Sequence, residues 1–393
     1  MTDFLRIDIL NRYKKIQATM LSQGVDICIV CSATNLFYTL GRVINGYLVI
    51  FAQGDPILFQ RRPVIEEIES QQYLIRKPED ITTKLESVGR KIEGKVALEM
   101  DTLSVNEYLR LTKAFGLSET ANANTLLRMV RTIKTDYEID LMRRSGALHT
   151  QLYAKIPSLY KDGMSDYDVE IAIEYEARKL GSLGHFRIFG TSMEIFAGSV
   201  LAGQNALAPS PYDFALGGAG TNESMPVGAN NEILKEGQTL MVDIGGNFTG
   251  YMSDMTRVFS IGELKSDLAK KAHYTAIEIE NMFEQEAKPG VLAKELYDKA
   301  LDIVAGAGLE DYFMGYDQKA AFIGHGVGIE INEQPVFSAR SRDVLEKGMT
   351  FALEPKFTIP GVGAVGVENT FLVTAEGVEK LTDMPNEIVN LRG

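Results

Sequence analysis

The chain has 393 residues, of which 45% are hydrophobic and 24% charged, a balance typical of globular proteins that bury a core. This length predicts two domains, or three. The 40 basic residues against 53 acidic ones give a net charge of −13, which argues against nucleic acid and anionic membranes as partners, since both require a basic surface.

The apolar runs and the amino-terminal residues bear on where the protein is located. No stretch approaches the ~20 apolar residues of a membrane span, and the first residues lack the basic start and apolar core of a signal peptide. A cytoplasmic location without membrane contact is therefore predicted.

Cys28 and Cys31 have C-x-x-C spacing, but they lie in an apolar run that predicts a strand, where residues three apart face opposite ways. We expect both to pack in the core.

Predicted helices and strands alternate in the first part of the chain. The elements are a helix over 6–22 and strands over 26–31, 46–52 and 56–59. Capping-box spacing at Ser104 starts another helix. The pattern predicts a small α/β domain over 1–125, and the small polar residues near 118–134 predict a boundary.

The middle of the chain begins with helices. They start at the predicted caps Thr135 and Ser165, and His149 lies on the first of them beside polar residues, as expected of a helix surface. Residues 197–231 are rich in glycine, proline, asparagine and serine, which predicts a long ordered loop with a functional role.

Strand patterns dominate the rest. Apolar runs at 239–245 and 252–261 flank a glycine-rich turn and predict a β-hairpin. A helix beginning at Ser266 carries His273, again expected on the surface, and the remaining elements are a helix over 292–305 and strands over 321–332, 349–358, 364–374 and 377–381. Helices in the middle with strands at both ends predict an α+β domain over 130–393.

Ionisable residues in apolar strand patterns require an explanation. They are Asp243, Asp254, His325, Glu354 and Glu368. Burying one unpaired carboxylate costs several kcal/mol, and four together would repel one another. Arg257 lies close to Asp254 in the sequence, and a pair of divalent metal ions would neutralise the carboxylates. Oxygen ligands with one imidazole suit Mn, Fe, Co or Zn.

Each of these residues also has an ordinary structural interpretation. A strand aspartate beside a hairpin is commonly a turn or edge feature, and a histidine between glycines can be a packing residue. The occurrence of all five at strand centres favours a metal site over these separate explanations.

The motifs around the five residues occur in a specific order. They are V-D-I-G-G at 242–246, Y-M-S-D-M-T-R at 251–257, G-H-G-V-G at 324–328, L-E-P at 353–355 and V-E-N-T at 367–370. This set resembles the pita-bread metallopeptidase family, which includes Xaa-Pro dipeptidases, aminopeptidase P, the methionine aminopeptidases and the non-metal relative creatinase. The amino-terminal part resembles the family's creatinase-type domain, through G-V-D at 24–26 and T-N-L-F-Y-T-L-G at 34–41.

The resemblance implies two divalent metal ions (Mn, Co, Zn or Fe) held by these five residues. Asp243 would chelate one ion, Asp254 and Glu368 would bridge the pair, and His325 and Glu354 would complete the shell of the other. Such a pair can hold a hydroxide and polarise a scissile carbonyl. The family resemblance also gives Glu354 a catalytic role as proton shuttle and implies a homodimer.

Three positions depart from the family's pattern. Pro226 stands where family peptidases have a histidine before the first ligand strand, Asn332 where they have a second histidine, and Gly366 where many Xaa-Pro enzymes have an arginine. Proline and glycine offer no side-chain donor, and asparagine cannot act as an acid. His185 or Arg187 could compensate as part of a substrate shell, although a surface or packing role for His185 is the simpler interpretation.

Three hypotheses follow from the sequence. The first is a metal-dependent hydrolase of the Xaa-Pro dipeptidase or aminopeptidase P type, which cleaves the N-terminal Xaa-Pro bond of peptides. The second keeps the metal centre but gives it a small non-peptide substrate, as a hydrolase or lyase, because of the departures at Pro226, Asn332 and Gly366. The third, a binding module without catalysis, is disfavoured because it has no need of four buried carboxylates.

Overall fold

The computed structural model describes residues 2–66, 70–185, 187–190 and 197–392, and the chain separates into two compact units, Met1–Arg131 and Thr132–Gly393. The segment near 118–134 contains strand β6 (Thr120–Asn122) followed by helix α5 (Ala123–Thr132), and the division between the units falls within it. Among the described residues, no helix combines the length and the apolar character that a bilayer crossing requires.

The first unit contains a six-stranded sheet in the order β4-β3-β2-β1-β5-β6, with helices that pack against it. Its other elements are α1 (Asp3–Ser22), β1 (Ile27–Val30), α2 (Ala33–Leu40), β2 (Asn45–Phe51), β3 (Ile57–Arg62), β4 (Gln71–Leu74), α3 (Asp80–Glu86), β5 (Val96–Leu98) and α4 (Val105–Phe115). Cys28 is fully buried on the central strand β1, and neither cysteine is in a disulfide.

The second unit is the predicted α+β domain. Its helices are α6 (Asp136–Tyr153), α7 (Ile156–Leu159), α8 (Asp166–Lys179), α9 (Asp267–Glu286) and α10 (Ala293–Ala307). Its strands are β7 (Gly198–Ala202), β8 (Thr239–Asn247), β9 (Met252–Ser260), β10 (Phe322–Gly326), β11 (Glu333–Ser338), β12 (Thr350–Leu353), β13 (Lys356–Ile359), β14 (Gly363–Gly366), β15 (Asn369–Val373), β16 (Val378–Lys380) and β17 (Val389–Asn390).

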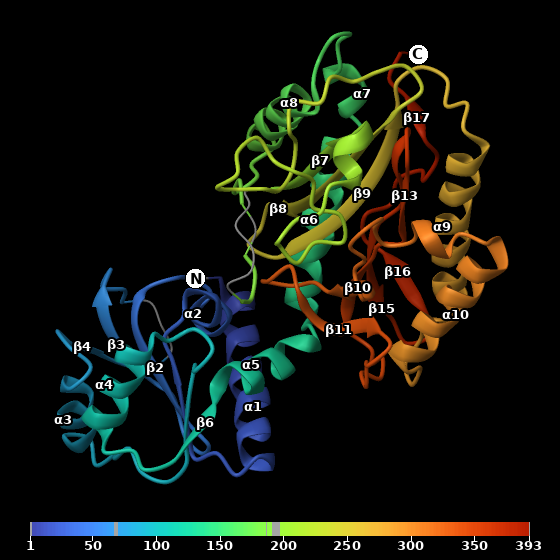
Figure 1. The fold of residues 1–393 in the computed structure, drawn as a ribbon. Helices are drawn as coiled ribbons and strands as arrows, with labels where there is room; N and C mark the ends of the chain where they lie inside the picture. The colour runs from blue at the N-terminus through green and yellow to red at the C-terminus, as the bar shows by residue number, and fades with distance from the viewer. Residues whose placement is uncertain (1, 67–69, 186, 191–196, 393) are drawn as a thin grey trace. The chain divides into compact units, whose positions relative to one another are not determined.

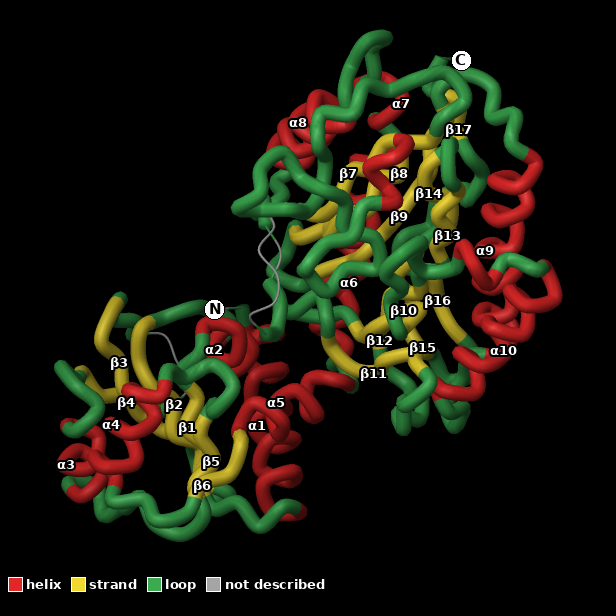
Figure 2. Tube along the Cα trace, viewed as in Figure 1, coloured by secondary structure: helices red, strands yellow, loops and turns green. Residues whose placement is uncertain are grey.

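These strands form three sheets, ordered β17-β9-β8-β7, β11-β10-β12-β15-β16 and β13-β14. Helices α9 and α10 pack on the second and third sheets, and α6 and α8 pack on the first (Figure 1). The strands thus lie between two layers of helices. Figure 2 shows the helices in red on the outside and the strands in yellow between them. Both helix layers contribute apolar side chains, so the sheets are buried.

Two predictions of strand and loop positions were wrong. Residues 198–202, predicted as loop, form β7. This strand pairs with β8 at the edge of the sheet, and its apolar residues Val200 and Leu201 are buried. The predicted strand over 321–332 ends at Gly326, and β11 begins only at Glu333.

The hairpin of β8 and β9 was predicted correctly, and its register decides which side chains share a face. Asp243 pairs with Thr256, so Asp254, two residues before Thr256, faces the same side as Asp243. The alternate residues Val242 and Met255 point into the core beneath α6 and α8. The two aspartates are therefore directed away from those helices.

His149 and His273 were predicted on helix surfaces, and this was wrong, because both are buried. His149, on α6, has its Nδ1 3.0 Å from Ser253 Oγ on β9 and its ring 5.0 Å from that of Tyr153. Burial lowers the pKa of His149 from 6.5 to about 3. Polar neighbours in the sequence concealed the fact that this face of α6 packs against a sheet.

The buried His149 predicts a loss of stability in mild acid. Its lowered pKa means that protonation favours the unfolded chain, so its contribution is present above pH 6.5 and is lost as the pH falls toward 3. Between pH 7 and 5 the loss is about 2 kcal/mol in the free energy of unfolding. Urea titrations of wild type and His149→Gln at both pH values measure this, and the variant is expected to lose less.

His185→Gln, at an exposed histidine, is the control and is expected to keep the wild-type pH dependence. An identical pH dependence in His149→Gln and wild type would contradict the assignment to His149.

Candidate metal centre

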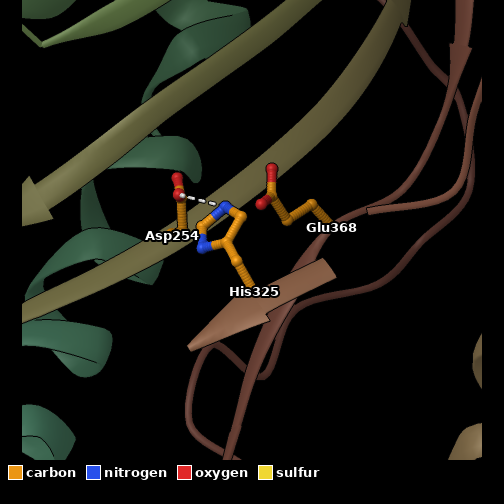
Figure 3. A group of neighbouring side chains, drawn as sticks. All are labelled: Asp254, His325 and Glu368. Atoms are coloured by element: carbon orange, nitrogen blue, oxygen red, sulfur yellow. Dashed lines mark ion pairs between the residues drawn. The ribbon is translucent and has the colours of Figure 1, made fainter. Parts of the chain in front are cut away.

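Side chains from separate strands converge at one place in the second unit. Asp254 comes from β9, His325 from β10 and Glu368 from the residue before β15 (Figure 3). Potential ligand atoms of these three lie within 4.8 Å of one another. Asp243, Glu354 and Glu368 form a second such group. The structure therefore brings all five predicted metal-ligand residues into one cluster, with Glu368 shared by both groups.

Neighbouring threonines and an arginine bind the segments that carry Asp254 and Glu368. Thr256 Oγ1 donates a hydrogen bond to Glu368 Oε2 at 2.6 Å, while Thr370 Oγ1 bonds to both the amide and the carbonyl of Asp254, at 2.7 and 2.8 Å. The Arg257 guanidinium does not reach the carboxylates and instead donates to the Glu368 carbonyl at 2.9 Å. These contacts connect β9 to β15 and so fix the positions of Asp254 and Glu368 relative to each other.

A buried lysine lies inside the cluster. Lys356 Nζ is 2.6 Å from Glu354 Oε2, 2.8 Å from Asp243 Oδ2 and 3.2 Å from Glu368 Oε2. The side chain is 0% exposed. An ammonium group has three N–H donors, and here each has a carboxylate partner. The group formed by Asp243, Glu354 and Glu368 therefore surrounds a cation that belongs to the chain itself.

The charges in the cluster shift the pKa values of its members in opposite directions. Burial would raise the pKa of Glu354, but the charges of Lys356 and His325 and their hydrogen bonds lower it to about 2. Burial raises the pKa of Glu368 to about 8, and Lys356 opposes this only in part. Burial and the charges of Glu368 and Asp243 likewise raise the pKa of Asp254. Glu354 is thus the member held most firmly as a carboxylate.

His325 occupies the more accessible side of the cluster. Its Nε2 lies 3.3 Å from Glu354 Oε1 and 3.8 Å from Asp254 Oδ2. Its side chain is 15% exposed and that of Asp254 10%. Burial would lower the pKa of His325, but the hydrogen bond and charge of Glu354 raise it. His325 is therefore the most exposed member of the cluster and Lys356 the most buried.

Gly366 is the departure from the family pattern that lies next to this lysine. It pairs with Lys356 across β13 and β14. A Cβ at position 366 would lie 2.8 Å from Lys356 Cα, 3.2 Å from Lys356 Cγ and 2.4 Å from the Pro355 carbonyl oxygen, and the φ angle is +148°. A side chain at position 366 would therefore collide with the strand that carries Lys356.

The residues predicted to form a substrate shell lie in another group of contacts. The Asn332 side chain binds the backbone of Phe189 twice, donating to its carbonyl and accepting from its amide, both at 2.8 Å. The Arg187 carbonyl accepts from the Ile331 amide at 2.8 Å. His185 is exposed, and its carbonyl accepts from Asn247 at 3.0 Å. Asn332 thus fixes the backbone at 187–189.

The sequence analysis missed Lys356. Its signal was present, because Lys356 lies two residues after Glu354 and begins an apolar strand. The basic residue considered from the sequence was Arg257, which lies close to Asp254.

Pro226 is the third departure from the family pattern. Its carbonyl accepts a hydrogen bond from Ser210 Oγ at 2.9 Å.

Comparison with known proteins identifies the class to which this site belongs. Residues 140–375 match metallopeptidase family M24, and residues 12–133 match the creatinase/prolidase N-terminal domain. The first match spans more than half of the chain. The chain therefore belongs to metallopeptidase family M24; it is a hydrolase with a creatinase-type domain followed by a pita-bread domain.

Individual relatives agree with this membership. A probable dipeptidase PepE from Mycobacterium tuberculosis is 30% identical over 292 residues, which cover 74% of this chain and 68% of that protein. An Xaa-Pro dipeptidase from Pyrococcus horikoshii is 24% identical over 389 residues, 98% of this chain and 100% of that protein.

Solved structures share the fold. The Xaa-Pro dipeptidase from Bacillus anthracis superposes with a TM-score of 0.81 at 23% identity, covering 97% of this chain and 99% of that one. The prolidase from Pyrococcus horikoshii superposes with a TM-score of 0.78 at 22% identity, covering 96% and 100%.

Family M24 implies a divalent metal cofactor, and the two ligand groups differ in how well they fit one. Asp254, His325 and Glu368 offer hard oxygens and an imidazole, the ligand types that suit Mn, Fe, Co or Zn. Asp243 and Glu354 are in contact with the ammonium of Lys356. With the lysine in this position, the group of Asp243, Glu354 and Glu368 does not fit a metal ion.

The close packing at Gly366 predicts that even a methyl group is disruptive there. Gly366→Ala is expected to lower the free energy of unfolding by about 1–3 kcal/mol, because the added Cβ meets backbone atoms at an unfavourable φ. Gly377→Ala, where a Cβ would meet nothing within 4 Å, is the control. Urea unfolding of both variants measures the difference, and equal changes would contradict this account of Gly366.

Proposed function

We propose that the chain is a metal-dependent peptidase that hydrolyses the N-terminal bond of dipeptides or short peptides, with Xaa-Pro substrates as the class of choice. The observation that carries the proposal is the meeting of Asp254, His325 and Glu368 within 4.8 Å, beside the ionised Glu354. The relatives named as dipeptidase and Xaa-Pro dipeptidase support the choice of substrate.

Asp254, His325 and Glu368 would hold a divalent ion. Bound there, such an ion activates water at neutral pH and polarises the scissile carbonyl. A substrate carbonyl would be placed beside His325, the most exposed member of the cluster. The family resemblance implies two ions with Asp243 as a further ligand, but the ammonium of Lys356 already contacts Asp243.

Glu354 would act as the proton acceptor. Its pKa is lowered to about 2, so it is ionised at neutral pH, the form that a proton acceptor requires. So weak a base would take the proton only from water made more acidic by a bound divalent ion. Its Oε1 faces His325 and its Oε2 faces Lys356, which fixes the orientation of the carboxylate. The proton would then pass to the leaving amine.

A second candidate is a small non-peptide substrate at the same site. It is favoured by the side chain of Asn332, which is used to bind the Phe189 backbone at the position where family peptidases have a histidine. A cytoplasmic location and a homodimer complete the proposal.

Hydrolysis of a panel of Xaa-Pro dipeptides, other dipeptides and longer Xaa-Pro peptides by Mn- and Co-loaded protein tests the function. Glu354→Gln is expected to lower kcat by about 10²–10⁴-fold, because the amide cannot accept the proton. Glu379→Gln removes a carboxylate from an exposed ion pair with Arg143 and is expected to leave kcat unchanged.

Cleavage that is lost in Glu354→Gln and retained in Glu379→Gln would support the peptidase. Cleavage that survives in Glu354→Gln would remove that residue from the mechanism. Failure to cleave any peptide, by protein shown to contain metal, would overturn the peptidase in favour of the non-peptide substrate.

A further inference from the structure

We propose that Lys356 is a built-in cation that takes the place of one of the two metal ions expected from the family resemblance, so that the chain binds a single divalent ion, at Asp254, His325 and Glu368. The inference deepens the proposed function, since it concerns the same site and rests on its being a metal site.

The first support is that the lysine occupies the whole of one ligand group. Its Nζ contacts an oxygen of Asp243, Glu354 and Glu368, at 2.8, 2.6 and 3.2 Å. The same three residues form one of the two groups with ligand atoms within 4.8 Å of one another. The ammonium therefore stands where the ligands of an ion converge.

The second support is that an ion and the ammonium cannot share this group. Transition-metal ions bind carboxylate oxygen at about 2.0–2.2 Å. An ion bound in that way to Asp243 and Glu354 would lie almost at the Nζ position, since Nζ is already within 2.8 Å of both. Steric overlap and repulsion between like charges exclude this, so binding an ion would require the lysine to leave.

The third support is that the lysine is fixed in place by its surroundings. The side chain is 0% exposed, and its strand β13 pairs with β14, where the missing side chain of Gly366 leaves room for the lysine stem. The Lys356 carbonyl also accepts from the Met314 amide at 2.8 Å. A lysine that left would abandon three charged hydrogen bonds together with this packing.

The fourth support is the charge of the cluster. With all four carboxylates ionised, Asp243, Asp254, Glu354 and Glu368 would carry four negative charges, and Lys356 compensates one of them. The lysine thus supplies part of the positive charge that a second ion would otherwise bring, and a single divalent ion beside it leaves the cluster within one charge of neutrality.

The remaining ligand group contains His325, the most exposed side chain of the cluster at 15%. Asp254 and Asp243 are each 10% exposed, and Lys356 is fully buried. An ion held by Asp254, His325 and Glu368 would lie beside the most exposed residue, whereas the ammonium is shielded from solvent. Unlike a metal ion, the ammonium group cannot coordinate water or substrate. It contributes a fixed positive charge and orients the Glu354 carboxylate.

The number of bound ions tests the inference directly. Wild-type protein reconstituted with Mn(II) and freed of excess ion is expected to contain about one ion per chain by elemental analysis. Its electron paramagnetic resonance spectrum is expected to show isolated Mn(II) without exchange coupling. Anomalous diffraction from such crystals should place the ion beside His325.

Lys356→Ala removes the cation and opens its space, so its metal content is expected to rise from about one to about two ions per chain, with an exchange-coupled spectrum. Lys134→Ala is the matched control, because Lys134 is another buried lysine, 3.0 Å from Glu333. It is expected to keep about one ion. Circular dichroism verifies that both variants are folded.

Each outcome decides a separate point. Two coupled ions in wild-type protein, or none, would overturn the inference, and so would a folded Lys356→Ala that still binds one. If Lys356→Ala does not fold, the wild-type ion count and the anomalous map decide alone. Protein with one ion that cleaves no peptide would overturn the proposed function while leaving the inference intact.

Discussion

The contact between the Lys356 ammonium and three carboxylates is the interaction on which the site depends. Buried carboxylates repel one another and lose hydration, and removal of one partner from a buried ion pair typically costs about 3–5 kcal/mol. Lys356 Nζ lies within 3.2 Å of Asp243, Glu354 and Glu368, so part of their negative charge is compensated by the chain itself. Asp254, the nearby carboxylate for which no lysine contact is found among the described residues, lies beside His325.

The pairing of the strands brings these side chains close together. The register of β8 and β9 places Asp243 opposite Thr256, so both aspartates leave the hairpin on one face. Thr256 and Thr370 then bind Glu368 and Asp254 across the gap to β15. Because the groups sit on paired strands and hydrogen-bond to one another, their spacing is set by backbone pairing rather than by flexible loops.

The sequence predicted those features that have a local signature. The hairpin followed from its glycine-rich turn, and the five ligand residues followed from charge in apolar runs. His149 and β7 were missed because burial on a neighbouring sheet leaves no local mark: Val200 and Leu201 form too short an apolar run to be separated from a loop. Lys356 was missed although its position two residues after Glu354 was visible, because a lysine is seldom buried and only tertiary contacts show that this one is.

Gly366 and Lys356 lie against each other on paired strands. A Cβ at position 366 would meet Lys356 Cα at 2.8 Å and Lys356 Cγ at 3.2 Å, so a side chain there would displace the strand that carries the lysine and crowd the lysine stem. The family resemblance implies an arginine at this position in many Xaa-Pro enzymes, whereas this chain has Gly366 there and, on the paired strand β13, a lysine that contacts three carboxylates. Family membership rests on fold and motif order. The number of metal ions depends instead on the space around Nζ, which the motifs do not describe.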